Sequence, residues 1–454
     1  FQQDSYSQEC INTAIPTICS LPELNHAIVL FGDEDSSTYD YRSANHTFGN
    51  AVPPMGMPAG QNLPFGKIAK RVVGNKAKVF IVGGITDLYQ AEQILRDGSA
   101  DMVALTRAHF ADPMLVKKTQ EERTEEIKRC IGANECISRI FDQRPAACVV
   151  NPATGREKRW GVGTLTKATS KNQKNIIVIG GGISGMHFSA IAAERGHLVT
   201  IVEQNEKLGG HINILADLPG KDNWRKFVAD LQHKVAQHGV TVEKNHKIDV
   251  SYINSRNPDC VVVATGSKWR RDGVSPYRPG IETLPGSDQD NVFGLDDAII
   301  NAQRDRNSLG NKVVIIEEAG TYLPLGLADI LSKSGGTEVH LITPEPRVGG
   351  EAYKTLELMQ IMPRLVENGV LFHTETNVTS IDGDSVMTNF LWGGGVNKID
   401  KVTSFVFALY RSAEDSLFYA LKGMVPELHL LGDAMAPRRP AQIMFDAEVL
   451  GREV

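Results

Sequence analysis

The chain has 454 residues, of which 41% are hydrophobic and 22% are charged, so it can form about two to four domains with buried cores. Its 48 Lys and Arg residues against 54 Asp and Glu residues give a net charge of −6, and no long basic run is present that would follow a phosphate backbone. These values argue against a small binding module and against nucleic-acid binding, and the lack of a long apolar run argues against a membrane span.

The number and spacing of the cysteines indicate the cellular compartment and a candidate metal site. Six cysteines are too few for a disulfide framework in a chain of this length, and no secretory signal precedes the folded part, so we expect a cytoplasmic protein. Three of them, Cys130, Cys136 and Cys148, lie within nineteen residues. This clustering indicates a metal site.

The first part of the chain predicts a loop and then two βα units. Residues 1–39 have no clear pattern, whereas residues 40–66 are rich in Pro, Gly and Asn, which predicts a long loop. At 77–105, two apolar runs flank a helical stretch, and such consecutive units imply parallel strands. Residues 151–174 carry few large apolar side chains and therefore predict a linker at a domain boundary.

A second α/β pattern begins after this linker. Gly180, Gly182 and Gly185 form GxGxxG directly after an apolar run at 176–179, and Glu203 ends the next predicted strand. This order is typical of a dinucleotide-binding unit. The glycines let backbone N–H groups approach a pyrophosphate at a helix N-terminus, and the acidic side chain accepts hydrogen bonds from the ribose.

More buried strands and glycine signals follow. The strands are predicted at 259–264, 312–317, 338–343, 403–408 and 428–432. The signals are Gly209–Gly210, Thr265–Gly266 and Gly432–Asp433, each of which alone is compatible with an ordinary turn. Together with the GxGxxG turn, these three signals make four in an order that resembles the flavoproteins with two dinucleotide-binding domains. The resemblance implies cofactor contacts for the residues of these signals, namely Gly210, Thr265, Gly266, Gly432 and Asp433, the last pair beside the flavin ribityl chain.

The turn after the strand at 312–317 departs from a nicotinamide site. Glu317 and Glu318 stand there, with bulky side chains up to Leu323, where a second GxGxxG is expected. Negative charge and bulk both oppose a pyrophosphate. We therefore do not expect NAD(P)H to bind.

The cysteine segment resembles the iron–sulfur segment of trimethylamine dehydrogenase and the 2,4-dienoyl-CoA reductases. Four thiolates are spaced C-x2-C-x2-C-x11-C in those proteins, and here Ala133 takes the place of one of them. The resemblance implies that the three remaining cysteines hold an iron–sulfur cluster, for which [3Fe-4S] suits three thiolates. A [4Fe-4S] cluster would need water or an oxygen ligand such as Asn134 or Glu135. The alternative is a cluster-free loop with three buried cysteines.

The two βα units resemble the last two units of the FMN barrel of old yellow enzyme. The resemblance implies that Gly83, Gly84, Thr106 and Arg107 bind the FMN phosphate, although Thr106 stands where glycine is usual. The alternative for Arg107 is a solvated surface charge. Because a barrel needs eight such units and fewer than 130 residues precede the cysteines, we expect only the C-terminal part of a barrel.

The resemblance covers residues 40–454 and reaches the amine dehydrogenase branch through GGHINILADLPG, ATGSKWRRDG and LHLLGDAMAPRR. It implies an α/β chain, the C-terminal part of a TIM barrel followed by two Rossmann-like dinucleotide-binding domains, one inserted in the other. The implied parts are the partial FMN barrel at 1–129, an iron–sulfur segment and linker at 130–172, an FAD- or ADP-binding domain at 173–290 plus 405–454, and an inserted nicotinamide-domain-like region without GxGxxG at 291–404.

The implied activity is oxidative N-demethylation of a small methylated amine, such as a dimethylglycine-like or betaine-derived compound. FMN would accept electrons and the cluster would pass them to electron-transfer flavoprotein or another redox subunit, in an oligomeric enzyme. Catalytic residues stay unknown because the substrate-contacting strands would lie in the rest of the barrel. One alternative is an NAD(P)H-dependent enoate or 2,4-dienoyl-CoA reductase, which residues 317–323 argue against. The other is a non-catalytic electron-transfer or scaffold subunit.

Overall fold

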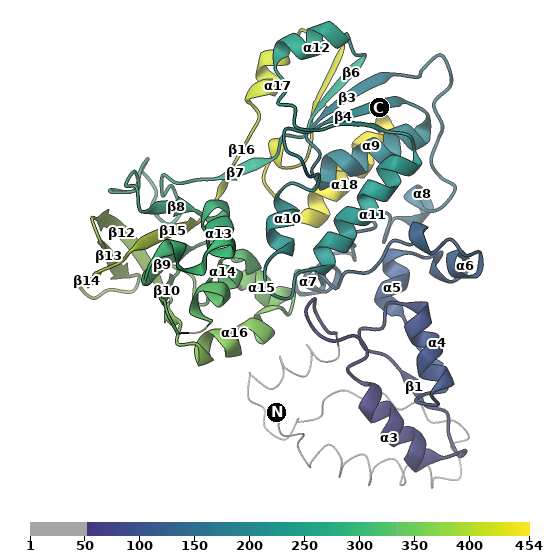
Figure 1. Cartoon of the computed structure of the whole chain (residues 1–454), viewed down its shortest axis with the longest axis horizontal. Coiled ribbons are helices and arrows are strands. Elements are labelled where there is room, and N and C mark those ends of the chain that lie inside the picture. Colours follow the sequence, from purple (N-terminus) through teal and green to yellow (C-terminus); the bar gives the residue numbers. More distant parts are fainter. Residues whose placement is uncertain (1–51, 334) are drawn as a thin grey trace. The chain divides into compact units, whose positions relative to one another are not determined.

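A computed structural model describes residues 52–333 and 335–454, in two compact units that divide between Asn134 and Glu135 (Figure 1). Residues 1–39 and the start of the loop predicted at 40–66 lie outside the described residues. Over the described ranges, no helix combines the length and apolar character that crossing a membrane requires.

The described part of the first unit contains a strand–helix–strand pattern. Strands β1 (Phe80–Ile81) and β2 (Met102–Val103) pair in parallel, and α4 (Leu88–Arg96) connects them. The Asp87 side chain caps α4 by accepting hydrogen bonds from the N–H groups of Tyr89 and Gln90. This confirms the strand, helix and strand order expected at 77–105. The other helices are α3 (Leu63–Val73), α5 (Thr106–Ala111), α6 (Leu115–Gln120) and the 3-10 turn η1 (Thr124–Glu126).

Helix α3 begins inside the segment 40–66, so the prediction of a loop there is wrong at its end. Pro64 lies in the first turn of the helix, where the missing N–H of proline costs nothing and its fixed φ favours helix. The Pro-rich composition therefore hid a helix start.

The second unit contains a first parallel sheet that follows the linker. Its strand order is β17-β6-β3-β4-β5, with all neighbours parallel. The strands are β3 (Asn175–Ile179), β4 (Leu198–Val202), β5 (Thr241–Glu243), β6 (Cys260–Val263) and β17 (Glu427–Leu430). Nearly all of β3 and all of β6 are buried, as expected for strands covered on both faces.

Helices cover both faces of this first sheet (Figure 1). On one face, Ile177 and Val261 share a core with Leu421 of α17 (Ser416–Leu421) and with Tyr252 of α12 (Val250–Arg256). The helices of the other side are α9 (Ile183–Arg195), α10 (His211–Ala216), α11 (Asn223–Gln237) and the C-terminal α18 (Pro440–Glu453), which follows the 3-10 turn η3 (Gly432–Ala434).

The strands of a second parallel sheet come between β6 and β17 in the sequence. Its order is β11-β10-β9-β15-β8, built from β8 (Val292–Gly294), β9 (Lys312–Glu317), β10 (Glu338–Ile342), β11 (Leu371–His373) and β15 (Ser404–Ala408). The helices of this region are α13 (Leu295–Arg304), the 3-10 turn η2 (Arg306–Leu309), α14 (Tyr322–Ser332), α15 (Gly350–Lys354) and α16 (Leu358–Glu367). After β15 the chain returns to the first sheet through β17. Both sheets make the described chain a mixed α/β fold with two Rossmann-like units.

Three small features were not predicted. An antiparallel sheet is formed by β12 (Thr376–Asp382), β13 (Ser385–Phe390) and β14 (Val396–Ile399). A two-stranded antiparallel ribbon joins β7 (Ser267–Trp269) to β16 (Arg411–Ala413). The predicted linker at 151–174 is not wholly irregular, because it contains α8 (Glu157–Trp160) with a buried Trp160, and it follows α7 (Glu135–Phe141).

Candidate functional site

The GxGxxG turn lies at the carboxyl end of β3, and its three glycines have different surroundings. Gly180 has φ of +108°, and a Cβ there would lie 2.3 Å from the Ala264 carbonyl oxygen. A Cβ at Gly185 would lie 2.2 Å from the Gly180 carbonyl oxygen. A Cβ at Gly182 would meet no atom within 4 Å. The first and third glycines therefore permit close backbone packing, and the second borders open space at the start of α9.

Glu203 follows β4 and its buried carboxylate lies beside this turn. Oε2 accepts a hydrogen bond from the Gly181 N–H at 2.8 Å. Oε1 accepts from the backbone and the side-chain amide of Asn205, each at 2.8 Å. The acidic side chain is thus fixed against the glycine turn by the chain itself. Sequence reasoning did not identify Asn205.

The second glycine pair lies against the first turn. Gly209 forms an isolated parallel bridge with Gly182 and donates a hydrogen bond to the Gly181 carbonyl at 2.8 Å. Gly210 has φ of +57° and precedes α10. The residues predicted after β3 and after β4 therefore meet at one edge of the sheet.

The Thr265–Gly266 and Gly432–Asp433 signals follow the adjacent strands β6 and β17. The Thr265 hydroxyl donates a hydrogen bond to the Glu414 carbonyl, and Gly266 has φ of +83°. Because β17 pairs with β6 in parallel, both signals lie at the same carboxyl edge as the GxGxxG turn.

Asp433 has an ionic partner that the sequence did not reveal. Its Oδ2 accepts a hydrogen bond from the Ser267 hydroxyl at 3.1 Å and forms an ion pair with Arg411. Its Oδ1 accepts from the Arg438 N–H at 2.9 Å. Arg411 comes from the short ribbon β7–β16, which carries no motif, so its position depends on the tertiary fold.

The turn after β9 in the second sheet is filled by the chain's own carboxylates. Glu317 is 1% exposed, and its two oxygens accept hydrogen bonds from the N–H groups of Gly320 and Gly349. Burial raises the pKa of Glu317 to about 7. These two amides are the kind of donors that a pyrophosphate would need, and they already have an acceptor within the chain.

Glu318, the residue after Glu317, forms a buried ion pair. Arg278 Nη2 lies 2.9 Å from Glu318 Oε1, and both side chains are almost fully buried. The Ser275 hydroxyl also donates to the Glu318 carboxylate. Burial raises the pKa of this carboxyl, while the Arg278 charge opposes that change.

The three clustered cysteines divide between the two units. Cys130 belongs to the first unit, Cys136 and Cys148 belong to the second, and each is partly buried. In the second unit, Cys148 lines a pocket of about 270 Å³ together with Arg139, Arg156 and Arg438. Asp446 lines the same pocket and pairs with Arg438, so Arg139 and Arg156 give the pocket its excess positive charge, which favours an anionic group at Cys148.

The two candidate oxygen ligands beside the cysteines have partners within their own units. The Asn134 Oδ1 accepts a hydrogen bond from Arg107. The buried Glu135 forms an ion pair with Arg439, whose Nε lies 2.8 Å from Glu135 Oε1. A metal ion would have to compete with these bonds for either oxygen.

The glycines predicted to bind FMN lie at one edge of the β1–β2 pair. Gly83 and Gly84, with φ of +139° and +63°, follow β1, and Thr106 begins α5 after β2. The parallel register of Phe80 with Met102 puts both loops at the carboxyl ends of the strands. Arg107 is half-buried and donates hydrogen bonds to Asn134 and, at 2.8 Å, to the Pro53 carbonyl, so it is not a fully solvated charge.

Two protein families match parts of the second unit. A model described as NAD(P)-binding Rossmann-like domain matches residues 178–240. A model described as pyridine nucleotide-disulphide oxidoreductase matches residues 222–422.

Longer matches come from individual proteins. The chain is 29% identical over 389 residues to N,N-dimethylglycine/sarcosine dehydrogenase of Chromohalobacter salexigens, covering 83% of this chain and 53% of that protein. It is 28% identical over 388 residues to cinnamate reductase of Clostridium sporogenes, covering 84% and 54%. The structure of histamine dehydrogenase from Rhizobium sp. 4-9 has a TM-score of 0.82 and 26% identity over 90% of this chain and 60% of that one.

The chain is a relative of these oxidoreductases. This relationship agrees with the resemblance inferred from the cysteine, glycine and C-terminal motifs. The chain spans about half the length of the curated relatives it matches. The relatives include both amine dehydrogenases and enoate reductases, so relationship alone does not choose between the two activities.

Proposed function

We propose that this chain is the nucleotide-binding and electron-transfer part of a flavin and iron–sulfur enzyme that N-demethylates a small methylated amine. A dimethylglycine-like compound is the proposed substrate. The turn after β9 carries this proposal, because the Glu317 carboxylate accepts hydrogen bonds from the Gly320 and Gly349 N–H groups that a nicotinamide dinucleotide would need. A flavin that does not take electrons from NAD(P)H can take them from an amine substrate. The names of the amine dehydrogenases among the relatives agree with electron flow from an amine substrate to the flavin.

The first Rossmann-like unit would hold the adenosine diphosphate half of FAD, or ADP itself. The open space at Gly182 and the N-terminus of α9 support this assignment. Gly180 and Gly185 would let the turn approach the ligand, and Glu203 would face the ribose. The edge that also carries Gly210, Thr265, Gly266, Gly432 and Asp433 would contact the rest of the cofactor.

The cysteine segment would hold an iron–sulfur cluster through Cys130, Cys136 and Cys148. The existing partners of Asn134 and Glu135 favour a three-iron cluster over a four-iron cluster with an oxygen ligand. The arginines around Cys148 would offset the negative charge of a thiolate-bound cluster. Such a cluster supplies single-electron transfer when it is bound.

The first unit would be the end of a TIM barrel that binds FMN. Gly83, Gly84 and Thr106 would offer backbone N–H groups to the phosphate, and Arg107 would offer its guanidinium. The division proposed is a barrel part at 1–129, a cluster segment at 130–172, a domain at 173–290 plus 405–454, and an insertion at 291–404. The return of β17 to the first sheet supports the nested arrangement.

The whole enzyme would pass electrons to electron-transfer flavoprotein or another redox subunit and would be an oligomer. A cytoplasmic setting agrees with the low cysteine content.

The second candidate function is that of an NAD(P)H-dependent enoate or 2,4-dienoyl-CoA reductase. The presence of cinnamate reductase among the relatives favours this candidate.

Stopped-flow spectroscopy of the intact holoenzyme separates the candidates. We expect dimethylglycine or another methylated amine to bleach the flavin rapidly, NADH and NADPH to bleach it slowly or not at all, and reoxidation to need a protein acceptor. Rapid bleaching by NADPH with no response to any methylated amine would establish the reductase instead. Bound flavin that responds to neither reductant would favour a non-catalytic subunit.

A further inference from the structure

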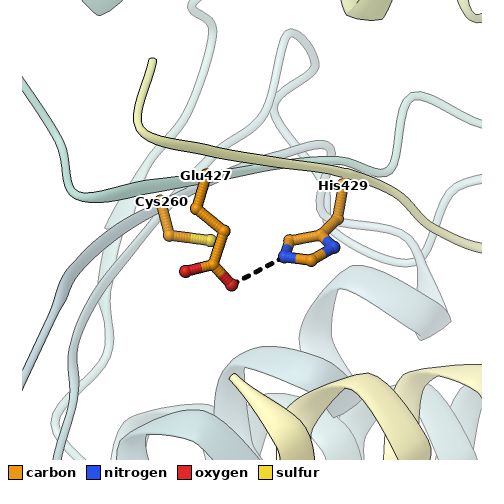
Figure 2. Close-up of side chains that lie close together, drawn as sticks. All are labelled: Cys260, Glu427 and His429. Carbon is orange, nitrogen blue, oxygen red and sulfur yellow. Dashed lines mark hydrogen bonds and ion pairs between the residues drawn. The ribbon is translucent and has the colours of Figure 1, made fainter. Parts of the chain in front are cut away.

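Three metal-binding side chains gather at the amino edge of the first sheet, the edge opposite the glycine turns. Glu427 and His429 belong to β17 at the border of the sheet, and Cys260 begins the neighbouring β6. In the parallel register Cys260 is paired with Glu427. Residues two apart on a strand share a face, so Glu427 and His429 lie on the same side as the thiol (Figure 2).

The ligand atoms of this group are close together. Cys260 Sγ, one Glu427 carboxylate oxygen and a His429 ring nitrogen all lie within 4.8 Å of one another. His429 Nε2 and Glu427 Oε1 are 2.8 Å apart and share a hydrogen bond. A tetrahedral zinc ion bound at typical lengths separates such atoms by roughly 3.3 to 3.5 Å. Small side-chain rotations would therefore admit an ion in place of that hydrogen bond.

We propose that Cys260, Glu427 and His429 bind a zinc-type divalent ion, with water as the fourth ligand. A thiolate, an imidazole and a carboxylate form a donor set that zinc accepts readily. The ion would replace the hydrogen bond between His429 and Glu427, and the thiol proton would leave to the solvent as the thiolate coordinates. Cys260 is buried, while Glu427 and His429 each keep 31% of their side chain exposed. An ion can therefore reach the site from the border of the sheet.

The surroundings orient the carboxylate. Lys174 Nζ pairs with Glu427 Oε2 and thereby leaves Oε1 directed toward His429. Such an outer contact fixes a ligand in the geometry that a metal needs. The charge of Lys174 also opposes a cation, which predicts weaker binding than in a four-cysteine zinc site.

A bound ion would join the beginning of β17 to the beginning of β6. Strand β17 leads directly into Gly432 and Asp433 at the other edge of the sheet. The ion would therefore stabilise the strand that carries the Asp433 ion pair, and zinc should raise the unfolding temperature of the chain by mass action.

Cobalt(II), a tetrahedral stand-in for zinc, makes the proposal testable in the intact protein. We expect one equivalent to produce thiolate-to-cobalt charge-transfer absorption in the near ultraviolet and visible bands of tetrahedral intensity, and zinc to remove both. Cys260→Ser should lose the charge-transfer absorption, and His429→Gln should weaken binding by more than about 10-fold.

A matched control is present in the chain. His246 Nδ1 lies 3.9 Å from Glu243 Oε2 in another pair of the same residue types, and among the residues that the structure describes no cysteine thiol joins this pair at the distances found around Cys260. His246→Gln should bind cobalt as the unchanged protein does.

The outcomes that decide the proposal are separate from those of the proposed function, because cobalt binding is read without substrate or flavin. If Cys260→Ser does not fold, His429→Gln on the border strand carries the test, with circular dichroism as the folding check. Absence of the charge-transfer absorption in the unchanged protein, its persistence in Cys260→Ser, or undiminished binding by His429→Gln would overturn the proposal.

Discussion

Gly182→Val tests the nucleotide site with little disturbance of the fold. Gly182 has φ of −68° and ψ of 177°, which any residue adopts, and a Cβ there meets no atom within 4 Å. We therefore expect the free energy of unfolding to change by less than about 1 kcal/mol. The valine side chain would instead occupy the space through which a pyrophosphate reaches the N-terminus of α9.

The expected loss of affinity follows from the contacts that the side chain would block. A hydrogen bond from a backbone N–H to a charged phosphate contributes about 1.5 to 3 kcal/mol. Losing one or two of them, with the added steric conflict, should weaken ADP binding by at least about 100-fold, or roughly 3 kcal/mol. Calorimetric titration with ADP and chromatography of nucleotide released from the denatured protein would measure this loss.

Two other glycines serve as controls. Gly395→Val also adds a side chain in open space, away from the proposed site, and should leave ADP binding unchanged. Gly180→Ala should lose stability and binding together, because its Cβ would lie 2.3 Å from the Ala264 oxygen. A folded Gly182→Val protein with unchanged nucleotide content would refute the assignment.

Three further changes test other parts of the chain. Ala133→Cys supplies the thiolate that the family spacing has at this position, so the iron content should rise from about three to about four atoms per chain. Absence of iron from both proteins would contradict the proposed cluster. Burial raises the pKa of Glu317 from 4.5 to about 7, so the folded protein retains a proton that the unfolded chain releases. Its stability should fall by on the order of 3 kcal/mol as the pH rises from about 4.5 to about 7, and Glu317→Gln should reduce that slope in urea unfolding. Glu318→Ala leaves Arg278 buried without its partner and should cost about 3 to 5 kcal/mol in chemical unfolding, far more than Asp217→Ala in an exposed ion pair.

Features that depend on local backbone geometry were predictable from the sequence. A Cβ does not fit at Gly180 or at Gly185. The GxGxxG pattern predicts this requirement because it has glycine at both positions. The apolar runs of β3 and β9 were recognisable because strands buried on both faces leave no polar alternation.

Features that depend on tertiary contacts were not predictable. The ion pairs of Asp433 with Arg411 and of Glu318 with Arg278 join residues from separate segments of the chain. The ribbon β7–β16 has three residues in each strand, too few for a periodic pattern to be distinguished. The strands of the β12–β14 sheet carry many Thr, Ser and Asn side chains, so hydrophobic periodicity gave no signal there.

The buried carboxyl group of Glu317 gives two backbone amides near the end of β9 an acceptor that requires no bound ligand. In a domain that relies on a nucleotide, the amides around the glycine turn gain their anionic acceptor only when the ligand arrives, and stability then depends on ligand concentration. Here Gly320 and Gly349 keep an acceptor at all times. Replacing Glu317 by glycine would therefore remove this internal acceptor, and the altered region would need a bound ligand to recover the stability it has now.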